Sequence, residues 1–269
     1  MTARPAIDLT DVEAALAALA VPAPPTLAPA TLTSVGLADE YATVATPVGD
    51  VYVAWNGLGI STVDRAEDDA AFEQRFRRMI GRPLRRAVAL PEALARAIGQ
   101  RLAGDRRANL RLDLRGRSEF ERAVWLKALE IPHGEVRPYG WIAAEIGRPR
   151  AVRAVGTALA HNPVPLVVPC HRVVRSDGLL GNYSLGGPGV KRDILASEGL
   201  DPGELESLAR ARIRYLGSDT TRIYCLPSCH QARRITASHR VAFSSARASE
   251  AAGYRACRRC RPDSAARVA

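Results

Sequence analysis

The sequence predicts an α+β protein with several domains, and three observations lead to this prediction. Short strands of alternating apolar and polar residues occur in the first half, helical spacing dominates from Ser118, and four cysteines gather near the end. The chain has 269 residues, more than one domain of about 100 to 200 residues needs. We therefore expect two or three domains rather than a single compact unit.

The segment 1–36 is expected to form a short helix and then a linker. Thr10 and Glu13 have the spacing of a capping box, and Val12, Leu16 and Leu19 would form one apolar face. The stretch VPAPPTLAP that follows is rich in proline and predicts an extended chain.

The segment 37–114 predicts a small domain of strands and helices. Apolar and polar residues alternate on either side of the turns PVGD and NGLG, which is typical of an antiparallel sheet. The stretches AFEQRFRRMI and PEALARAIGQRLAG have helical spacing, and the second is expected to begin at Pro91 and stop near Gly104.

The segment 115–201 predicts helices separated by short breaks. Ser118 and Glu121 form a capping-box pattern at the start of SEFERAVWLKALEI. The stretches PYGWIAAEIG and PRAVRAVGTALAHN flank GRPR and predict either a helix-turn-helix or an ordinary helical hairpin with a solvated basic face. A helix is expected from about Val190 to Gly199. We assign 202–214 to a linker, with a polar helix as the alternative.

The charge balance favours a polyanionic partner. The net charge is +10 with a pI near 9.9, and Lys127 and Lys191 are the only lysines beside many arginines. Nucleic acid is the partner that this balance suits best, although compositional bias of a genome also produces arginine-rich chains. Acidic residues near the start argue against a signal peptide, and no apolar run approaches the roughly 20 residues that span a bilayer. We therefore expect a cytoplasmic protein without a membrane partner.

One cysteine lies apart from the others, in the stretch VPLVVPCHRVV. Cys170 follows an apolar run that is expected to be a buried strand ended by Pro169, and His171 comes next. A cysteine attacks as its thiolate, so a reactive one needs a base, and a carboxylate such as Glu198 would orient that base. From these residues alone, a structural cysteine and the nucleophile of a hydrolase both remain open.

The other four cysteines have the spacing of a metal site. Cys225-x3-Cys229 and Cys257-x2-Cys260 supply four thiolates in two short loops, as a tetrahedral Zn²⁺ site requires. Four reduced structural cysteines are the alternative. We assign 215–263 to this module and 264–269 to a tail, and expect His230 and His239 to lie on the surface.

The run from about Ser118 to Gly199 resembles the active domain of the O6-alkylguanine-DNA alkyltransferases. The motifs that carry the resemblance are RAVG, NPVP, PCHRVV, the GNYS turn and a late lysine and glutamate. TPVGDVYVAW is similar to the N-terminal domain of that family. The resemblance implies a ribonuclease H-like N-terminal domain, a winged-helix-like active domain and a monomer that repairs double-stranded DNA. It would take one methyl or alkyl group from O6-alkylguanine, and from O4-alkylthymine, onto its own cysteine.

The resemblance also implies a role for individual residues. Cys170 would accept the alkyl group, His171 would be a water-mediated base held by Glu198, and Asn162 would steady the turn. The residues expected to contact DNA or the extruded base are Arg153, Tyr139, Val173, Tyr183 and Ser184. Extrusion of the nucleotide is needed because the alkylated edge of a paired base is out of reach.

The stretches TTRIYCLPSCHQARRI and AAGYRACRRCRP resemble the zinc module of the Ada repair protein. That resemblance implies that Cys225 is a second acceptor, for methyl groups from DNA methylphosphotriesters. The module comes last here, Arg222 and Leu226 replace a glycine and a basic residue, and no AraC-type domain follows in this sequence. A structural or DNA-docking zinc knuckle therefore stays open beside the acceptor. Phosphate contacts are expected from its arginines, which are Arg233, Arg234, Arg240, Arg258, Arg259 and Arg261.

The function expected from these patterns is direct DNA repair in the cytoplasm, at the nucleoid when bound to DNA. The alternative is a methylation-responsive DNA-binding regulator, in which methylation is the signal rather than the purpose. Methylation of a thiolate removes negative charge beside DNA and would raise the affinity of the protein for DNA. Repair and regulation would therefore use the same chemistry.

Overall fold

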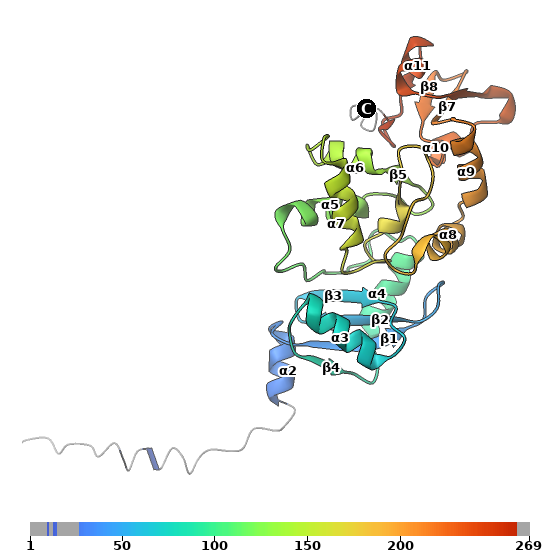
Figure 1. Cartoon of the computed structure of the whole chain (residues 1–269). Helices are drawn as coiled ribbons and strands as arrows, with labels where there is room; N and C mark the ends of the chain where they lie inside the picture. Colours follow the sequence, from blue (N-terminus) through green and yellow to red (C-terminus); the bar gives the residue numbers. More distant parts are fainter. Residues whose placement is uncertain (1–9, 11–12, 15–26, 263–269) are drawn as a thin grey trace, which may run out of the picture.

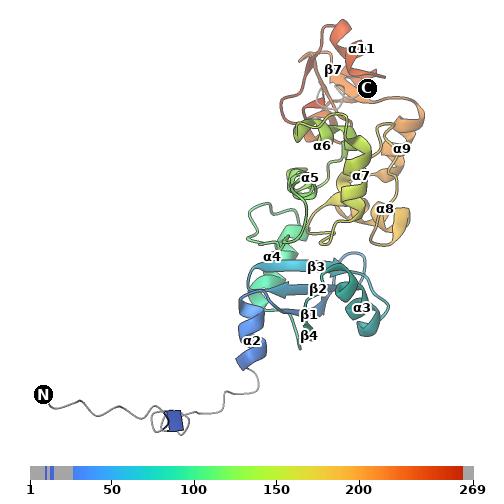
Figure 2. The same cartoon turned by 60° about the vertical axis from the view of Figure 1, so that its left-hand side comes forward.

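The structure, a computed structural model, describes residues 10, 13–14 and 27–262. Its mixture of sheets and helices confirms the α+β class. Figure 1 and Figure 2 show three bodies in a row, with the sheet of β1–β4 at one end, helices α5–α8 in the middle and strands β7–β10 at the other end. Val12, Leu16 and Leu19, the apolar face of the predicted N-terminal helix, lie outside the described residues. No helix in the described part is long and apolar enough to cross a membrane.

The first body is a four-stranded sheet in the order β3-β2-β1-β4, with one helix on each side of β4 in the sequence. Strands β1 to β3 are antiparallel, as predicted, whereas the short β4 runs parallel to β1 and was not expected. The elements are β1 (Asp39–Val44), β2 (Val51–Asn56), β3 (Gly59–Asp64), α3 (Asp69–Met79), β4 (Leu84–Arg86) and α4 (Glu92–Leu102).

Helix α3 is built as its sequence predicts. The Asp68 side chain accepts a hydrogen bond from the backbone N–H of Ala71 and caps the first turn. Phe72 and Phe76 are four residues apart, so both lie on one face, where they are buried against Tyr41 of β1. This packing holds α3 on the sheet.

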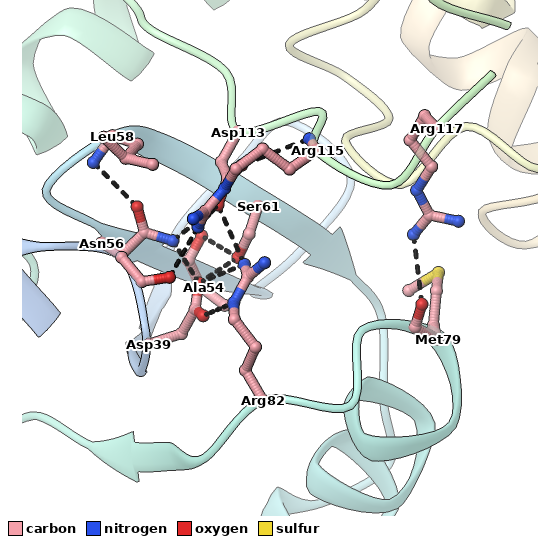
Figure 3. Close-up of polar contacts among 11 residues, drawn as sticks. Asp39, Ala54, Asn56, Leu58, Ser61, Met79, Arg82, Asp113, Arg115 and Arg117 are labelled. Carbon is pink, nitrogen blue, oxygen red and sulfur yellow. Dashed lines mark hydrogen bonds and ion pairs between the residues drawn. The ribbon is translucent and has the colours of Figure 1, made fainter. Parts of the chain in front are cut away.

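A buried polar network ties the first sheet to the chain that leads into the second body (Figure 3). The carboxylates of Asp39 and Asp113 have no exposed side-chain surface, and Asn56 donates to both, at 3.0 and 2.8 Å. Arg82 forms ion pairs with both carboxylates, at 2.6 and 3.0 Å, and Arg115 pairs with Asp113 at 2.7 Å. Two buried charges thus have cationic partners, as burial of ions requires.

We expect Asp113→Asn to lower the stability of the folded protein near pH 7. We also expect the variant to lose less of its stability than the wild type as the pH falls from 4 to 2. Burial by itself raises the pKa of Asp113, but hydrogen bonds from Arg115 and Asn56 outweigh it and lower the pKa to about 2. This value lies below the unfolded value of about 3.9, so ionised Asp113 stabilises the fold above about pH 4, by about 2 kcal/mol. That stabilisation is lost as the pH falls toward 2.

Urea unfolding at a series of pH values measures this effect. The matched control is Glu92→Gln, which removes the same charge from a side chain that is 90% exposed. If Asp113→Asn and wild type lose stability in parallel as the pH falls, the network does not act as described.

The second body holds the helices predicted from Ser118 onward. Ser118 and Glu121 form the predicted capping box at the start of α5. Two-residue strands β5 and β6 pair in parallel and bring the start of α6 beside the chain that follows Cys170. The elements are α5 (Glu119–Leu129), β5 (Arg137–Pro138), α6 (Tyr139–Glu145), α7 (Val152–Ala160), the 3-10 turn η1 (Cys170–Arg172), β6 (Val173–Val174) and α8 (Gly187–Ser197).

Two local predictions were wrong, and one alternative was confirmed. Helix α2 (Leu27–Ser34) replaces the end of the predicted proline-rich linker, because Pro29 lies in its first turn, where no intrahelical N–H is needed. Helix α9 (Pro202–Arg210), with Asp201 as its cap, confirms the polar helix that was the alternative to a linker at 202–214. The apolar run before Cys170 is a compact turn rather than a strand, with Leu166 at φ 71°.

The third body is a small sheet in the order β10-β8-β7-β9 that carries the four clustered cysteines. Its core is separate from the others and includes the buried rings of Tyr215, Tyr224 and Tyr254. The elements are β7 (Tyr215–Ser218), β8 (Ile223–Cys225), α10 (His230–Arg233), the 3-10 turn η2 (Ala237–His239), β9 (Arg240–Phe243), α11 (Ala246–Ala251) and β10 (Arg255–Ala256).

Candidate active site

Cys170 lies in a compact turn that Asn162 braces from within. The Asn162 side-chain amide donates to the Val168 carbonyl at 3.1 Å and to Cys170 Sγ at 3.1 Å, while its oxygen accepts from the Val164 N–H at 3.0 Å. Leu166 has a left-handed backbone in the same turn, at a cost of about 1 kcal/mol. The turn therefore holds the sulfur in one position although it contains no regular strand.

His171 is buried and is held from one side by Glu198. The distance from His171 Nε2 to Glu198 Oε1 is 2.8 Å, and Nδ1 is buried without a hydrogen-bond partner among the described residues. Glu198 also accepts from Arg172, at 2.8 to 3.0 Å, and from the backbone N–H of Gly134 at 3.1 Å. Gly134 has φ +68°, and a side chain there would meet the Glu198 carbonyl at 2.8 Å.

These contacts determine which groups are charged. Burial by itself raises the pKa of Glu198, but hydrogen bonds from His171 and Arg172 outweigh it and lower the pKa to about 2. Burial lowers the pKa of His171, although Glu198 opposes that change. His171 is therefore neutral near pH 7, with the proton on Nε2 toward Glu198 and a lone pair on Nδ1. This is the tautomer that a general base needs.

Burial raises the pKa of the Cys170 thiol, while the Asn162 contact and the charge of Lys191 lower it in part. Lys191 is buried and donates to the carbonyls of Val173 and Leu180, at 2.6 Å each. Burial lowers the pKa of Lys191 to about 8, and Cys170 opposes that change. The resting sulfur is thus a thiol beside a buried cation and a neutral histidine.

Two tyrosines complete the immediate surroundings. The Tyr183 ring lies edge-on to His171, with centroids 6.0 Å apart, and its buried hydroxyl has no hydrogen-bond partner among the described residues. Burial raises the pKa of Tyr139, the first residue of α6, and Cys170 raises it further. Both hydroxyls therefore stay protonated and are able to donate.

The other residues expected to contact DNA differ in their burial. Val173, three residues after Cys170, is buried in the central core. Ser184 lines a cavity of about 400 Å³ between the first two bodies, together with Asn162. Arg153 is exposed on α7. The structure therefore brings Cys170, His171, Glu198 and Asn162 together and leaves Arg153 at the surface.

Sequence reasoning assigned no role to Arg172 or Lys191. Arg172 is buried and bonds both oxygens of Glu198 as well as the Ile131 carbonyl. Nothing in the spacing of residues 172 and 198 indicated this contact. Lys191 carried a usable signal, because a lysine is rare in a chain whose cations are almost all arginine.

The four clustered cysteines form a candidate metal centre in the third body. Their sulfur atoms lie within 4.8 Å of one another, and all four residues are buried and free of disulfides. Sulfurs about 2.3 Å from a central ion, in a tetrahedron, lie within that spacing. The donor set therefore fits a metal ion. Cys225 and Cys257 also line a cavity of about 390 Å³ with Arg234 and His239.

The comparisons with known proteins agree with both sites. Residues 119–200 match the family model of the 6-O-methylguanine DNA methyltransferase DNA binding domain, and residues 210–263 match the metal binding domain of Ada. A methylated-DNA--protein-cysteine methyltransferase of Mycolicibacterium paratuberculosis is 40% identical over 159 residues, which are 59% of this chain and 92% of that protein. The protein of the same name from Rattus norvegicus is 51% identical over 86 residues, 32% of this chain and 41% of that protein.

A crystal structure of Mycobacterium tuberculosis OGT in complex with DNA is 34% identical and covers 59% of this chain and 92% of that chain, with a TM-score of 0.49. The Mycolicibacterium relative is matched over nearly its whole length, and the family model matches the turn that holds Cys170. The chain therefore belongs to the methylated-DNA--protein-cysteine methyltransferase family and carries, after the alkyltransferase part, an Ada-type metal-binding domain.

Proposed function

We propose that this protein repairs DNA by moving one methyl or alkyl group from O6-alkylguanine, or from O4-alkylthymine, to Cys170. The observation that carries the proposal is the arrangement of Cys170 with Asn162, beside a neutral His171 that Glu198 holds at 2.8 Å. Membership of the family supplies the substrate class. Each molecule acts once, because the carbon–sulfur bond of the product has no easy reversal.

The proposed reaction is a displacement at the alkyl carbon. The Cys170 proton passes to His171 Nδ1, directly or through a water, and the resulting imidazolium is stabilised by ionised Glu198. The sulfur then bonds to the alkyl carbon while the carbon–O6 bond breaks and its electron pair goes to the purine. The purine takes up one proton, from the Tyr139 hydroxyl or from the Ser184 region, and leaves as guanine.

Double-stranded DNA is the proposed partner, and base extrusion is the proposed route to Cys170. Extrusion costs a few kcal/mol, less for a damaged pair. Arg153 would fill the vacated place in the stack, Tyr139 would press on the phosphate, and Val173, Tyr183 and Ser184 would line the guanine pocket. The exposed position of Arg153 and the net charge of +10 support this assignment. We also propose that the N-terminal domain has a ribonuclease H-like fold and that the active domain has a winged-helix-like fold.

We propose Zn²⁺ as the ion of the four-cysteine site, because four thiolates are its usual structural donor set. Bound there, it would keep the thiolates deprotonated and close the two loops. A second function is favoured by the cavity that reaches Cys225, since Arg234 and His239 line it beside hydroxyl side chains that suit a phosphate. In that function Cys225 accepts a methyl group from a methylphosphotriester. A purely structural or DNA-docking role is the alternative.

Peptide mass spectrometry after reaction with two DNA duplexes tests both functions. With O6-methylguanine in the duplex, the peptide that contains Cys170 should gain one methyl group as the lesion disappears. With a methylphosphotriester, the peptide that contains Cys225 should gain it. An unmodified Cys170 beside a persistent lesion would refute the first function, and an unmodified Cys225 would leave its module with the structural or docking role.

We expect Glu198→Gln to slow the transfer to Cys170 by about tenfold or more, with the roughly 10²- to 10⁴-fold contribution of a general base as the upper bound. The amide holds no negative charge, so it stabilises the His171 imidazolium less. Because Glu198 raises the pKa of His171, its removal should also shift the acid limb of the rate profile to lower pH. Single-turnover rates across pH measure both effects.

The matched control for Glu198→Gln is Glu204→Gln, which changes an exposed residue of α9. Breaking the buried pair with Arg172 also costs roughly 3 to 5 kcal/mol of stability. The pH profile separates the two effects, since a loss of stability alone leaves the acid limb in place. An unshifted limb would therefore argue against the relay.

The location and the oligomeric state of the protein are also proposed. We place it in the cytoplasm, bound to the nucleoid, and expect a monomer, because transfer of one group to one cysteine needs one copy. A methylation-responsive regulator remains the alternative if methylated protein binds DNA more tightly without clearing lesions.

A further inference from the structure

The metal-binding domain contacts the alkyltransferase part just before helix α6, in its middle and at its end. Before the helix, the Ser228 hydroxyl bridges the N–H and carbonyl of Val136, at 2.9 and 3.1 Å. Within it, Trp141 Nε1 donates to the Cys260 carbonyl at 3.1 Å. At its last residue, Glu145 forms an ion pair with Arg261 at 2.9 Å. Tyr139, which is expected to touch the target nucleotide, is the first residue of this helix.

Glu135 is the charged centre of this contact. Its side chain is 1% exposed and accepts from Arg137 at 2.6 Å within its own domain. From the metal-binding domain it receives the His230 N–H at 3.2 Å and pairs with Arg259 at 3.4 Å. Arg259, which the sequence suggested for phosphate contact, therefore also pairs with the alkyltransferase part, while its side chain stays 49% exposed. A buried carboxylate that loses some of these donors is strongly penalised.

Trp141 is the second centre. The guanidinium carbons of Arg137 and Arg261 lie 5.7 and 5.4 Å from its ring centroid, within cation-π range. Arg137 comes from the alkyltransferase part and Arg261 from the metal-binding domain, so the indole contacts a cation of each.

Each of these contacts from the metal-binding domain comes from a cysteine of the site or from a residue next to one. Ser228 and His230 flank Cys229, whereas Arg259 and Arg261 flank Cys260. These two loops belong to different halves of the four-cysteine site. A metal ion would therefore fix both loops against α6 at once, and without it each loop gains conformational freedom.

Close apolar packing between the two parts is interrupted next to these contacts. A cavity of about 680 Å³ lies between the two parts, lined by Val136, Pro138 and Gly140 on one side and by Leu226 and Pro227 on the other. The contacts between the two parts described above are polar and cation-π, and they lie next to the cysteines.

We propose that the metal-binding domain positions helix α6, and with it Tyr139, for the reaction of Cys170 with DNA, and that Trp141 and Glu135 transmit this effect. The inference rests on the proposed function at Cys170 and adds a role for the metal site in it. Coupling between sites is reciprocal, so DNA bound at α6 should in turn slow the release of the metal.

The test uses full-length Trp141→Phe, which keeps an aromatic ring but removes the hydrogen bond to Cys260. Trp55→Phe is the matched control, because Trp55 lies in strand β2 of the first body. Each variant reacts once with O6-methylguanine in a duplex and once with O6-methylguanine as a free base, which needs no base extrusion. We expect Trp141→Phe to slow the duplex reaction by about tenfold, within the usual range for coupled sites, and to slow the free-base reaction clearly less, because only the duplex needs Tyr139 to press on a phosphate.

Metal removal gives a second readout. Chelation should slow the duplex reaction of the wild type about as much as the substitution does, with little further loss in Trp141→Phe. Saturating undamaged duplex should slow zinc transfer from wild type to a chromogenic chelator, and this protection should disappear in Trp141→Phe. Glu135→Gln should behave like Trp141→Phe in both assays.

Outcomes that overturn the inference are distinct from failure of the proposed function. Duplex rates equal to wild type in both variants, or equal losses with duplex and free base, would refute a positioning role. A rate of zinc release from the wild type that does not change when DNA is added would refute the coupling. If wild-type Cys170 stays unmodified with both forms of the substrate, the proposed function itself fails.

Discussion

Replacing Cys170 by serine is expected to abolish transfer from O6-methylguanine while DNA binding stays at the wild-type level. A hydroxyl is far less acidic than a thiol, whose ordinary pKa is about 8.5, and His171 is a weak base here because burial lowers its pKa. The change removes the nucleophile and leaves exposed Arg153 as it was. Single-turnover transfer of a labelled methyl group measures the loss, and fluorescence anisotropy with undamaged duplex measures binding.

Cys225→Ser is the control for this prediction, because it changes a cysteine of the other site. It should still clear O6-methylguanine at a measurable rate. Any decrease in that rate would come from the damaged metal site, because Cys170 is intact. Clearance of the lesion by Cys170→Ser at the wild-type rate would show that another residue accepts the group.

Removing the metal is expected to unfold the third body without unfolding the other two. The cluster of Tyr215, Tyr224 and Tyr254 forms a small core, and the two cysteine loops are joined by no disulfide. In small zinc domains metal binding contributes about 10 to 16 kcal/mol, so such domains depend on it for folding. Cleavage of residues 215–262 by a protease should therefore become rapid when a chelator is added, and zinc should restore protection.

Cys229→Ser should reproduce the effect of the chelator without any chelator present, since Cys229 is buried and its loss leaves three thiolates. The control is Cys170→Ser, whose digestion should respond to the chelator as the wild type does. Continued protection of metal-free protein would show that the apolar core alone holds this body together.

Local patterns predicted most of the regular structure. The strands around PVGD and NGLG, the capping box at Ser118 and the helices after it follow from alternation, turn residues and caps, which act over a few positions. One error came from proline: Pro29 lies in the first turn of a helix, where proline is tolerated, and not in a linker. Pro202 is tolerated in the first turn of α9 for the same reason.

The apolar run before Cys170 shows where periodicity stops being informative. Its composition is typical of a buried strand, but Asn162 bonds three groups within the same short segment and curls it into a turn. Such a side-chain brace competes with strand pairing and leaves no periodic signal in the sequence.

By itself, the sequence determined the types of residue that do the chemistry: a cysteine followed by a histidine, four cysteines at metal spacing and an excess of arginine. Only the tertiary structure decided which charges are paired. Arg172 forms an ion pair with Glu198, and Lys191 is buried near Cys170. Glu135 binds the metal-binding domain just before helix α6. The physical reason is that motifs depend on neighbours in the chain, whereas burial and ion pairing depend on which distant segments the fold brings together.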